Sequence, residues 1–317
     1  MQTLRVRVEG MWCQGRHNLA VTLASIDGVP LPAWTPGAHI DVHLGNGMVR
    51  QYSLTGSARD AQTYMICVAK ESASRGGSRF IHEKLRPGDE LSISPPRNLF
   101  PLLETPKTIL LAAGIGITPL YAMADQLRAN GQPCELHYYV RERQDIAFAE
   151  ALHQHDCTFW CSSEGFSPRQ HSVESLMHPQ PLARIYLCGP AGFMARMQEI
   201  ALAYGWQPEQ ICSEAFAPVP SVAAAPGDNV FHVTLTSTGQ RWPVPADSTI
   251  AQVLQAQGVA VPLSCEMGLC GACLTPVKQG EADHRDTVQS EAEKCASQQM
   301  IALCCSRSHS PELVIDL

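Results

Sequence analysis

Residues 264–274 read SCEMGLCGACL and contain three cysteines in the spacing C-x4-C-x2-C. The three are Cys265, Cys270 and Cys273. Cys304 follows further along the chain and completes the ligand spacing of a plant-type 2Fe–2S centre, in which four thiolates bind two irons. Gly268 and Gly271 let such a loop turn and let backbone N–H groups approach the sulfurs. The loop therefore predicts a 2Fe–2S cluster bound by the C-terminal part of the chain.

The cysteine spacing leaves two alternatives open. A structural zinc site also uses C-x2-C, although zinc sites usually show two such knuckles and no four-residue gap. A zinc site would make the chain a binding module with a nucleotide-sensing domain. The fourth ligand can be either member of the adjacent pair Cys304 and Cys305, because both spacings are sterically allowed. Most of the other cysteines are interpreted as small buried hydrophobic residues.

The composition indicates a folded protein of several domains that does not bind nucleic acid. The chain has 317 residues, which at roughly 150 residues per domain indicates two or three domains. Hydrophobic residues make up 45% of the chain and charged residues 17%, a balance that can bury several cores. The net charge is -7, whereas binding to phosphates needs clustered Lys and Arg.

No secretion signal and no membrane span are predicted, so we expect a cytoplasmic protein. The opening residues, MQTLRVRVEG, lack the apolar core of a signal peptide. The longest uncharged run, 108–124, is about the minimum length for a span and is broken by Gly114, Gly116 and Pro119. Thirteen cysteines in a chain of this length indicate metal ligation or free thiols and not a disulfide scaffold.

Periodicity and turn residues divide the chain into three domains. Residues 1–103 form short alternating runs separated by Gly, Pro, Asn and Asp, which predicts an antiparallel β-barrel with one helical stretch, RFIHEKL. Residues 104–216 alternate apolar strands with helices, which predicts an α/β domain with a parallel sheet. Residues 217–229 are rich in Pro and Ala and are interpreted as a linker. Residues 230–317 predict a smaller domain with a hairpin, a helix, the cysteine loop and a final strand.

Two glycine turns in the second domain predict a dinucleotide site. The segment LLAAGIGITPL reads as a strand, a turn with Gly114 and Gly116, and a helix whose free N–H groups can face a phosphate. The third glycine of the usual G-x-G-x-x-G pattern is absent, so this turn alone is a weak signal. A second segment, YLCGPAGFM, places Cys188 and Gly189 at the carboxyl edge of the same sheet, where wound α/β folds bind ligands.

The residues at the expected ribose site do not choose between NADH and NADPH. Arg141 and Arg143 follow the second strand of the domain, where the ribose of a dinucleotide is normally read. An arginine at this place can favour a 2′-phosphate, which only NADPH carries.

A strand in the first domain combines a cation with a flat aromatic ring. In VRQYSL, Arg50 and Tyr52 lie on one face, and Ser53 can offer a hydroxyl to a ring nitrogen. The nearby loop SRGGSRF offers consecutive backbone N–H groups, with Arg75 and Ser78, for a terminal phosphate. Each segment alone is more typical of a solvated surface. The two together, in a domain that precedes a dinucleotide-binding domain in the chain, predict a planar ligand that carries a phosphate.

The order R-x-Y-S, G-G-S, G-x-G-x-T-P, C-G-P-x-x-F-M and C-x4-C-x2-C resembles the phthalate dioxygenase reductase family. Close relatives in that family are the reductase components of vanillate O-demethylase and related Rieske oxygenases. The resemblance covers essentially the whole chain, and the set of motifs is highly specific. It implies an FMN-binding β-barrel, an NADH-binding α/β domain and a plant-type 2Fe–2S ferredoxin domain with a β-grasp fold. It also implies NADH as the donor.

The resemblance assigns cofactor-binding roles to residues in all three domains. For FMN they are Arg50, Tyr52 and Ser53, with Arg75, Gly76, Gly77 and Ser78 at its phosphate and Val68 and Lys70 lining the same site. For NADH they are Gly114, Gly116, Thr118 and Pro119, with Cys188 and Gly189 near the nicotinamide and Phe216 stacked on the flavin until nicotinamide displaces it. The cluster ligands are Cys265, Cys270, Cys273 and Cys304, because the family's final segment reads C-V-S-R where this chain has Cys304-Cys305-Ser306-Arg307.

The implied activity is electron transfer from NADH through FMN and the 2Fe–2S cluster to a Rieske-type oxygenase. The cofactors carry this chemistry, so no acid–base pair and no nucleophile is assigned. Residues 228–317 contain ten acidic and five basic residues, which suggests a basic docking patch on the partner. A reductase that serves a different acceptor is the alternative, since the acceptor's identity and substrate are not written in this chain.

Overall fold

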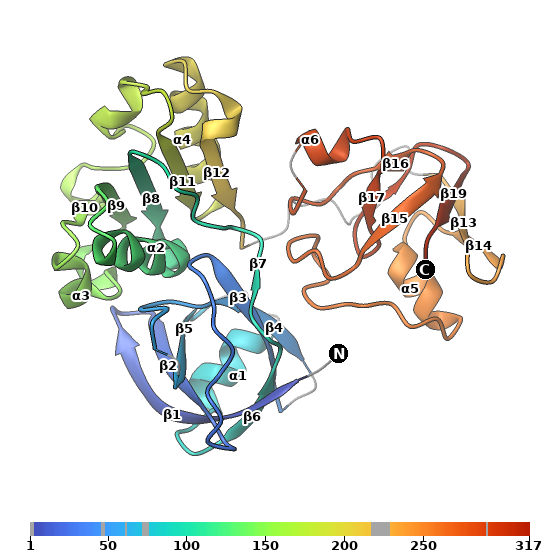
Figure 1. The fold of residues 1–317 in the computed structure, drawn as a ribbon, viewed down its shortest axis with the longest axis horizontal. Helices are drawn as coiled ribbons and strands as arrows, with labels where there is room; N and C mark the ends of the chain where they lie inside the picture. The colour runs from blue at the N-terminus through green and yellow to red at the C-terminus, as the bar shows by residue number, and fades with distance from the viewer. Residues whose placement is uncertain (1–2, 46–47, 61, 72–75, 217–228, 290) are drawn as a thin grey trace. The chain divides into compact units, whose positions relative to one another are not determined.

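A computed structural model describes residues 3–45, 48–60, 62–71, 76–216, 229–289 and 291–317 (Figure 1). The chain divides into two compact units, Met1–Phe216 and Ala217–Leu317. The expected linker at 217–229 lies outside the described residues except for its last position. Within the described ranges, no helix combines the length and the apolar character needed to cross a membrane.

The first half of unit one is an antiparallel sheet of seven strands (Figure 1). Its elements are β1 (Leu4–Gln14), β2 (Asn18–Ser25), β3 (Ala38–His43), β4 (Val49–Ser53), β5 (Thr63–Ala69), α1 (Gly77–Glu83), β6 (Glu90–Ile93) and β7 (Arg97–Asn98). The strand order is β4-β3-β6-β1-β2-β5, with β7 paired to β3. A bridge between Leu54 and Ile66 joins the two ends of this order, so the sheet nearly closes into a barrel. Alternating residues such as Val6 and Val8 fill the barrel, and Ile81 of α1 packs against them.

The second half of unit one is a parallel sheet of five strands. Its strands are β8 (Thr108–Ala113), β9 (Cys134–Val140), β10 (Thr158–Cys161), β11 (Arg184–Cys188) and β12 (Ile211–Glu214). Its helices are α2 (Ile117–Ala129), α3 (Ala149–His153) and α4 (Ala191–Ala203), and its 3-10 turns are η1 (Gly114–Gly116), η2 (Arg143–Asp145), η3 (Ser162–Glu164), η4 (Glu174–Met177) and η5 (Pro208–Gln210). The order β10-β9-β8-β11-β12 reverses between β8 and β11, which is where such sheets bind ligands.

Helices cover both faces of this parallel sheet. Leu110 packs with Leu127 of α2 on one face, whereas the next residue of β8, Leu111, packs with Met197 of α4 on the other. This alternation follows from the period of two along a strand. Strand β12 is the one element of the sheet that the sequence does not predict, because its four residues, ICSE, lack the apolar run of a buried strand.

The barrel and the parallel sheet share one hydrophobic core. Ala20 and Cys67, on the outside of the barrel, lie in the same cluster as Leu120 of α2. Ion pairs also connect the two sheets, for example Arg16 with Asp145 at 2.8 Å. The expected boundary at 103/104 therefore separates two sheets within a single compact unit.

Unit two is built on a mixed sheet of five strands. Its elements are β13 (Phe231–Leu235), β14 (Arg241–Val244), α5 (Ile250–Ala256), β15 (Leu274–Gln279), β16 (Ala282–Asp283), α6 (Glu291–Lys294), β17 (Met300–Ala302), β18 (Arg307–Ser308) and β19 (Glu312–Ile315). The order is β14-β13-β19-β15-β17, and β16 pairs separately with β18. Helix α5 begins at the N-cap Thr249 and packs Ile250 and Leu254 against the sheet. The three predicted architectures, an antiparallel barrel, an α/β sheet and a small α+β domain, are confirmed.

Candidate functional site

The four predicted cluster ligands are buried in unit two, with exposed fractions of 8% or less. Their thiols meet in two pairs, because Cys265 is hydrogen bonded to Cys270 and Cys273 to Cys304. The neighbouring thiol and then burial raise the pKa of Cys265 and of Cys273. Among the described residues, no three His, Cys, Asp or Glu side chains gather as they would around a single metal ion. Two pairs of thiols are consistent with a centre in which each of two irons takes two ligands.

Backbone N–H groups of the cysteine loop point at these sulfurs. Cys265 Sγ accepts from Met267 at 3.3 Å and from Leu269 at 3.4 Å, Cys270 Sγ accepts from Ala272 at 3.4 Å, and Cys304 Sγ accepts from Gly268 at 3.3 Å. Such N–H donors stabilise negative charge on thiolate ligands. The sequence analysis predicted such N–H groups from the loop glycines.

The structure distinguishes the adjacent cysteines Cys304 and Cys305. The sulfur of Cys304 faces Cys273 and receives the Gly268 N–H. The sulfur of Cys305 is also hydrogen bonded to Cys304, and its S–H donates to the carbonyl oxygen of Ala302 at 3.9 Å. This geometry favours Cys304 as the fourth ligand.

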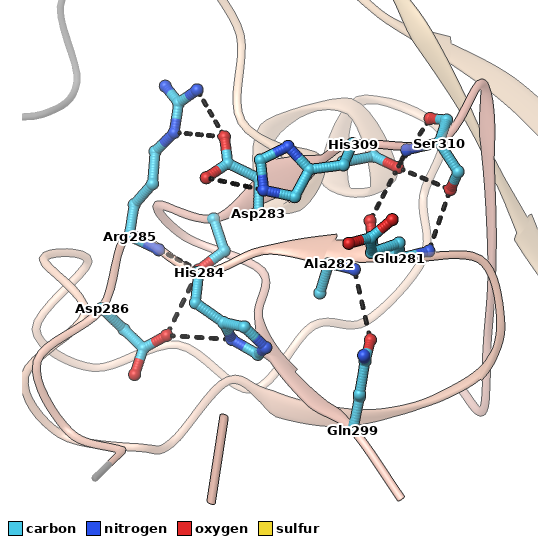
Figure 2. A network of polar contacts seen from close by, with 11 residues as sticks. Glu281, Ala282, Asp283, His284, Arg285, Asp286, Gln299, His309 and Ser310 are labelled. Carbon is cyan, nitrogen blue, oxygen red and sulfur yellow. Dashed lines mark hydrogen bonds and ion pairs between the residues drawn. The ribbon is translucent and has the colours of Figure 1, made fainter. Parts of the chain in front are cut away.

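A polar network joins β16 and the residues directly after it to His309 and Ser310 (Figure 2). Arg285 donates to the carboxylate of Asp283 at 2.6 and 2.8 Å. The buried carboxylate of Asp286 accepts from Ser306 Oγ at 3.3 Å, and the backbone of Asp286 lies against Gly268. Gly268 has a φ of 73°, and a Cβ there would lie 2.6 Å from Cys305 Sγ and 3.0 Å from Asp286 Cα, so glycine is strongly favoured at this place in the loop.

In unit one, the structure brings together the two segments predicted to hold a phosphate. A Cβ placed on Gly77 would lie 2.6 Å from Arg50 Cγ and 2.7 Å from its Nε, so Arg50 lies directly over the start of α1. Gly76, just before α1, has a φ of 98° that favours glycine. Ser78 is the next residue of α1, whereas Arg75 lies outside the described residues. Because Gly77 has no Cβ, the Arg50 side chain can lie directly against the backbone there.

The other residues assigned to the flavin lie on β4, on β5 or, in the case of Lys70, directly after β5. Burial raises the pKa of Tyr52, whose ring packs against the barrel core. The side chain of Val68 lies inside the barrel, and its carbonyl oxygen is 2.9 Å from His82 Nε2. Lys70 is exposed, and its N–H donates to the carbonyl of His17 at 2.8 Å. Val68 can therefore offer only backbone atoms to a ligand, while Lys70 can offer its side chain.

The two glycines of the nucleotide turn have different surroundings. Gly114 has a φ of 56°, and a Cβ there would meet nothing within 4 Å. A Cβ on Gly116 would lie 2.2 Å from the carbonyl oxygen of Cys188. Gly114 therefore borders open space that a ligand can enter, whereas Gly116 lets helix α2 begin against β11.

The remaining predicted residues of the two turns hold the turns in shape. Thr118 is buried and donates its hydroxyl to the carbonyl of Ile115 at 3.0 Å, and Pro119 is buried in the first turn of α2. A Cβ on Gly189 would lie 2.9 Å from the Cβ of Ala113, so that glycine allows the ends of β8 and β11 to approach. These contacts place the residues at the expected edge of the sheet.

One carboxyl group, missed in the sequence analysis, connects the barrel to this sheet edge. Glu214 ends β12 beside Cys188 of β11 and is hydrogen bonded to Ser53 of β4. Burial raises the pKa of Glu214 to about 8, against a smaller opposing effect of the Ser53 hydrogen bond. Its Oε2 atom is buried and has no hydrogen-bond partner in the described part of the chain. A polar atom in this state is typical of a site that a bound molecule completes.

Phe216 follows Glu214 by two positions and is the last described residue of unit one. Its exposed fraction is 37%, which is high for a phenylalanine. Phe216 lies two residues after the end of β12, the strand that pairs with β11 and its last residue, Cys188. Its stacking on a flavin stays a prediction.

Comparison with known proteins agrees with this arrangement. Residues 233–309 match the family described as 2Fe-2S iron-sulfur cluster binding domain. The chain is 41% identical to the vanillate O-demethylase oxidoreductase of Pseudomonas sp. (strain HR199 / DSM 7063), over 99% of this chain and 100% of that protein. The solved phthalate dioxygenase reductase is 33% identical with a TM-score of 0.73, over 99% and 98% of the two chains. The chain belongs to the phthalate dioxygenase reductase family.

Members of the phthalate dioxygenase reductase family are oxidoreductases, and the cofactor set of this chain is a flavin, NADH and a 2Fe–2S cluster. The arrangement also occurs as part of a larger protein. An intact type IV self-sufficient cytochrome P450 monooxygenase matches at 36% identity with a TM-score of 0.89, over 99% of this chain and 41% of that one. The reductase fold is thus found both as a separate chain and joined to a P450.

Proposed function

We propose that this chain is the NADH-dependent reductase component of a Rieske-type oxygenase system. The observation that carries the proposal is the contact between Ser53 and Glu214 beside Cys188. It places the strand assigned to the flavin against the sheet edge assigned to nicotinamide, which hydride transfer requires. When bound, the flavin supplies a two-electron acceptor for NADH, and the cluster supplies a one-electron carrier toward the oxygenase.

The flavin in this proposal is FMN, because the barrel offers a place for one terminal phosphate. Arg50 and the backbone of Gly76 and Gly77 would hold that phosphate together with Ser78 and Arg75. Tyr52 and Ser53 would contact the ring, with Val68 and Lys70 at its border. Arg50 over Gly77 supports this assignment, since the cation and the loop backbone already lie together.

The NADH side of the proposal uses the open part of the sheet edge. The backbone at Gly114 and Gly116, with Thr118 and Pro119 behind it, would approach the pyrophosphate, and Cys188 and Gly189 would border the nicotinamide. Phe216 would cover the flavin ring between turnovers. Glu214, whose pKa of about 8 keeps much of it protonated at neutral pH, would add a neutral hydrogen-bonding group there.

In unit two, Cys265, Cys270, Cys273 and Cys304 would hold the cluster, and the acidic surface would meet the oxygenase. Glu266 is exposed and lies directly after the first cluster cysteine. A basic patch on the oxygenase would complement this surface and guide a transient complex. We also propose a cytoplasmic setting, because none of the thirteen cysteines, all of them in the described part of the chain, is in a disulfide, as expected in a reducing compartment.

The first test is an anaerobic visible spectrum of the purified protein before and after NADH. Flavin and iron–sulfur bands that bleach with NADH are expected. A colourless protein, with iron and flavin analysis that excludes loss during purification, would overturn the reductase proposal and favour the zinc alternative.

A second candidate function keeps the reductase but changes the acceptor. The similarity to a self-sufficient cytochrome P450 monooxygenase favours a haem protein as the alternative partner. Reconstitution of NADH-dependent turnover with a purified Rieske oxygenase and with a purified P450 haem domain separates the two. Turnover with the P450 domain alone would reject the Rieske assignment and leave the electron path through this chain intact.

A further inference from the structure

Cys305 lies in a turn directly after the proposed fourth ligand of the cluster. The turn follows β17 and is closed by the backbone N–H groups of Cys305 and Ser306, which both donate to the carbonyl of Ala302, at 3.2 and 3.0 Å. It brings the thiols of Cys304 and Cys305 into a hydrogen bond with each other. Both side chains are buried, so this contact is shielded from water.

The thiol of Cys305 also lies against the cysteine loop at Gly268. A Cβ on Gly268 would lie 2.6 Å from Cys305 Sγ, so the sulfur rests directly on the loop backbone. The N–H of the same glycine donates to Cys304 Sγ at 3.3 Å, and its carbonyl accepts from the N–H of Thr287 at 3.0 Å. A fixed stretch of backbone therefore positions Cys305 beside the sulfur that the loop already contacts.

The other acceptors near the Cys305 thiol are already hydrogen bonded. The carbonyl of Ala302, to which the S–H donates at 3.9 Å, accepts the two N–H groups of the turn. Ser306 Oγ lies 3.8 Å from the sulfur, accepts the N–H of Arg285 at 3.1 Å and donates to Asp286 at 3.3 Å. The thiol proton is thus available to a stronger acceptor.

Cys304 becomes that acceptor when it binds iron. A cysteine binds a metal as a thiolate, so Cys304 then carries no proton, and the hydrogen bond between the two sulfurs runs from Cys305 to Cys304. A charged acceptor forms a stronger hydrogen bond than a neutral carbonyl. The S–H of Cys305 therefore turns from the carbonyl to the thiolate.

We propose that Cys305 donates its S–H to the Cys304 sulfur and thereby raises the reduction potential of the 2Fe–2S cluster. A hydrogen bond to a ligand sulfur withdraws negative charge from it and so stabilises the reduced, more negative cluster. The family's final segment has valine at this place, which offers no donor, so Cys305 is not needed to bind a cluster. The inference rests on the proposed function, in which Cys304 is a ligand, and makes Cys305 a positioning residue that acts through Cys304.

The test compares Cys305→Ala, which removes the donor, with Cys305→Ser, which has a hydroxyl, a stronger donor than a thiol. The cluster potential of the full chain is measured by anaerobic dye titration followed by visible and EPR spectra. In Cys305→Ala the potential should shift to a lower value, so that the ratio of reduced to oxidised cluster at the wild-type midpoint falls by about threefold or more. In Cys305→Ser the potential should shift above the wild-type value.

Cys295→Ala is the matched control, because it removes an exposed thiol from the same unit. Its potential should equal that of the wild type.

Potentials that do not rise in the order alanine, cysteine, serine at position 305 overturn the inference, and equal downward shifts in both variants assign the effect to packing. If Cys305→Ala fails to assemble a cluster, Cys305→Ser decides alone, and an unchanged or lower potential there overturns the inference. Loss of the cluster in both variants would make Cys305 a ligand and also overturn it. The titration uses neither NADH nor an oxygenase. A wild-type cluster that titrates with dyes but is not reduced by NADH would overturn the proposed function and leave this inference intact.

Discussion

The nucleotide turn of unit one and the cysteine loop of unit two both depend on glycine, and they use it differently. At Gly114 the turn opens onto empty space, so its backbone is accessible to a molecule from solvent. At Gly268 the loop is closed, because a Cβ there would lie 2.6 Å from Cys305 Sγ and 3.0 Å from Asp286 Cα. The open turn suits a ligand that binds and leaves, and the closed loop suits a group that stays.

This difference also explains why the cysteine motif is easier to recognise in the sequence than the nucleotide turn. A resident cluster needs four sulfurs and several aimed N–H groups, so its loop is constrained at nearly every position. A nucleotide that exchanges needs mainly accessible backbone and room, which many turns provide. The following experiments test this contrast, beginning with the largest expected effect.

Replacement of each cysteine of the adjacent pair by serine should show which of the two binds the cluster. Cys304→Ser is expected to abolish the cluster, because it removes the thiol that faces Cys273. Cys305→Ser should retain the cluster, because that thiol donates to a backbone carbonyl. Iron and acid-labile sulfide analysis checks this, with about two of each per chain expected where the cluster forms. The opposite pattern would assign the fourth ligand to Cys305.

The two glycines of the nucleotide turn should respond unequally to alanine. Gly116→Ala is expected to destabilise unit one by about 3 kcal/mol or more, because its Cβ would collide with the backbone of Cys188. Gly114→Ala should cost only about 1–2 kcal/mol for its left-handed φ, and should raise the KM for NADH. Thermal unfolding and NADH kinetics of both variants check this. Equal losses of stability would show that the two surroundings do not differ as described.

The buried carboxyl of Glu214 should make stability depend on pH. Its pKa of about 8 lies above the ordinary value of 4.5, so the folded protein holds a proton that the unfolded chain releases between these values. The stabilising contribution is complete below pH 4.5 and is lost as the pH rises through about 8, a change on the order of a few kcal/mol. Melting temperatures from pH 5 to 9 should therefore fall more steeply for the wild type than for Glu214→Gln.

The exposed residue Glu209 provides the control for that experiment. Glu209→Gln removes a carboxylate from the same unit, and its side chain is exposed. The pH profile of this variant should follow the wild type. If Glu214→Gln also follows the wild type, the carboxyl of Glu214 does not carry a raised pKa.

The smallest effect is expected from a single charge on the acidic unit. Glu266→Lys should lower the association rate with the oxygenase a few-fold at low salt, and the difference should shrink as salt screens the charges. Reduction of ferricyanide by NADH should not change, because it needs no docked partner. Glu209→Lys, on unit one, serves as the control. A docking rate that does not respond to Glu266 or to ionic strength would contradict an electrostatically guided complex.

Much of the fold and part of the site could be predicted because the signals are local. The alternation of strands and helices predicts the parallel sheet, and the cysteine spacing predicts a buried loop with N–H groups on sulfur. The contact of Arg50 with the start of α1 follows from two short motifs close together in the chain. In each case the decisive residues belong to short motifs that can be read in the sequence, and the pattern itself is the evidence of structure.

The rest of the site depends on contacts that no local pattern contains. Glu214 is a single acid in a short polar strand, and its partner Ser53 comes from the other sheet of the unit. Gly114 and Gly116 look equivalent in sequence, and only the structure distinguishes them, by the left-handed φ of Gly114 and by the backbone of Cys188 against Gly116. One signal in the sequence could have pointed to Glu214. It lies two residues before Phe216, which the family resemblance assigns to the flavin.

Each sheet is complete within one unit, and this affects how the gene for such a chain can be rearranged by recombination. The ladders of β1–β12 all lie before residue 217, and those of β13–β19 all lie after residue 228. A single cut between these positions breaks no pairing of strands. A gene for this chain can therefore lose, gain or exchange its iron–sulfur segment by one recombination event, and each product retains whole sheets.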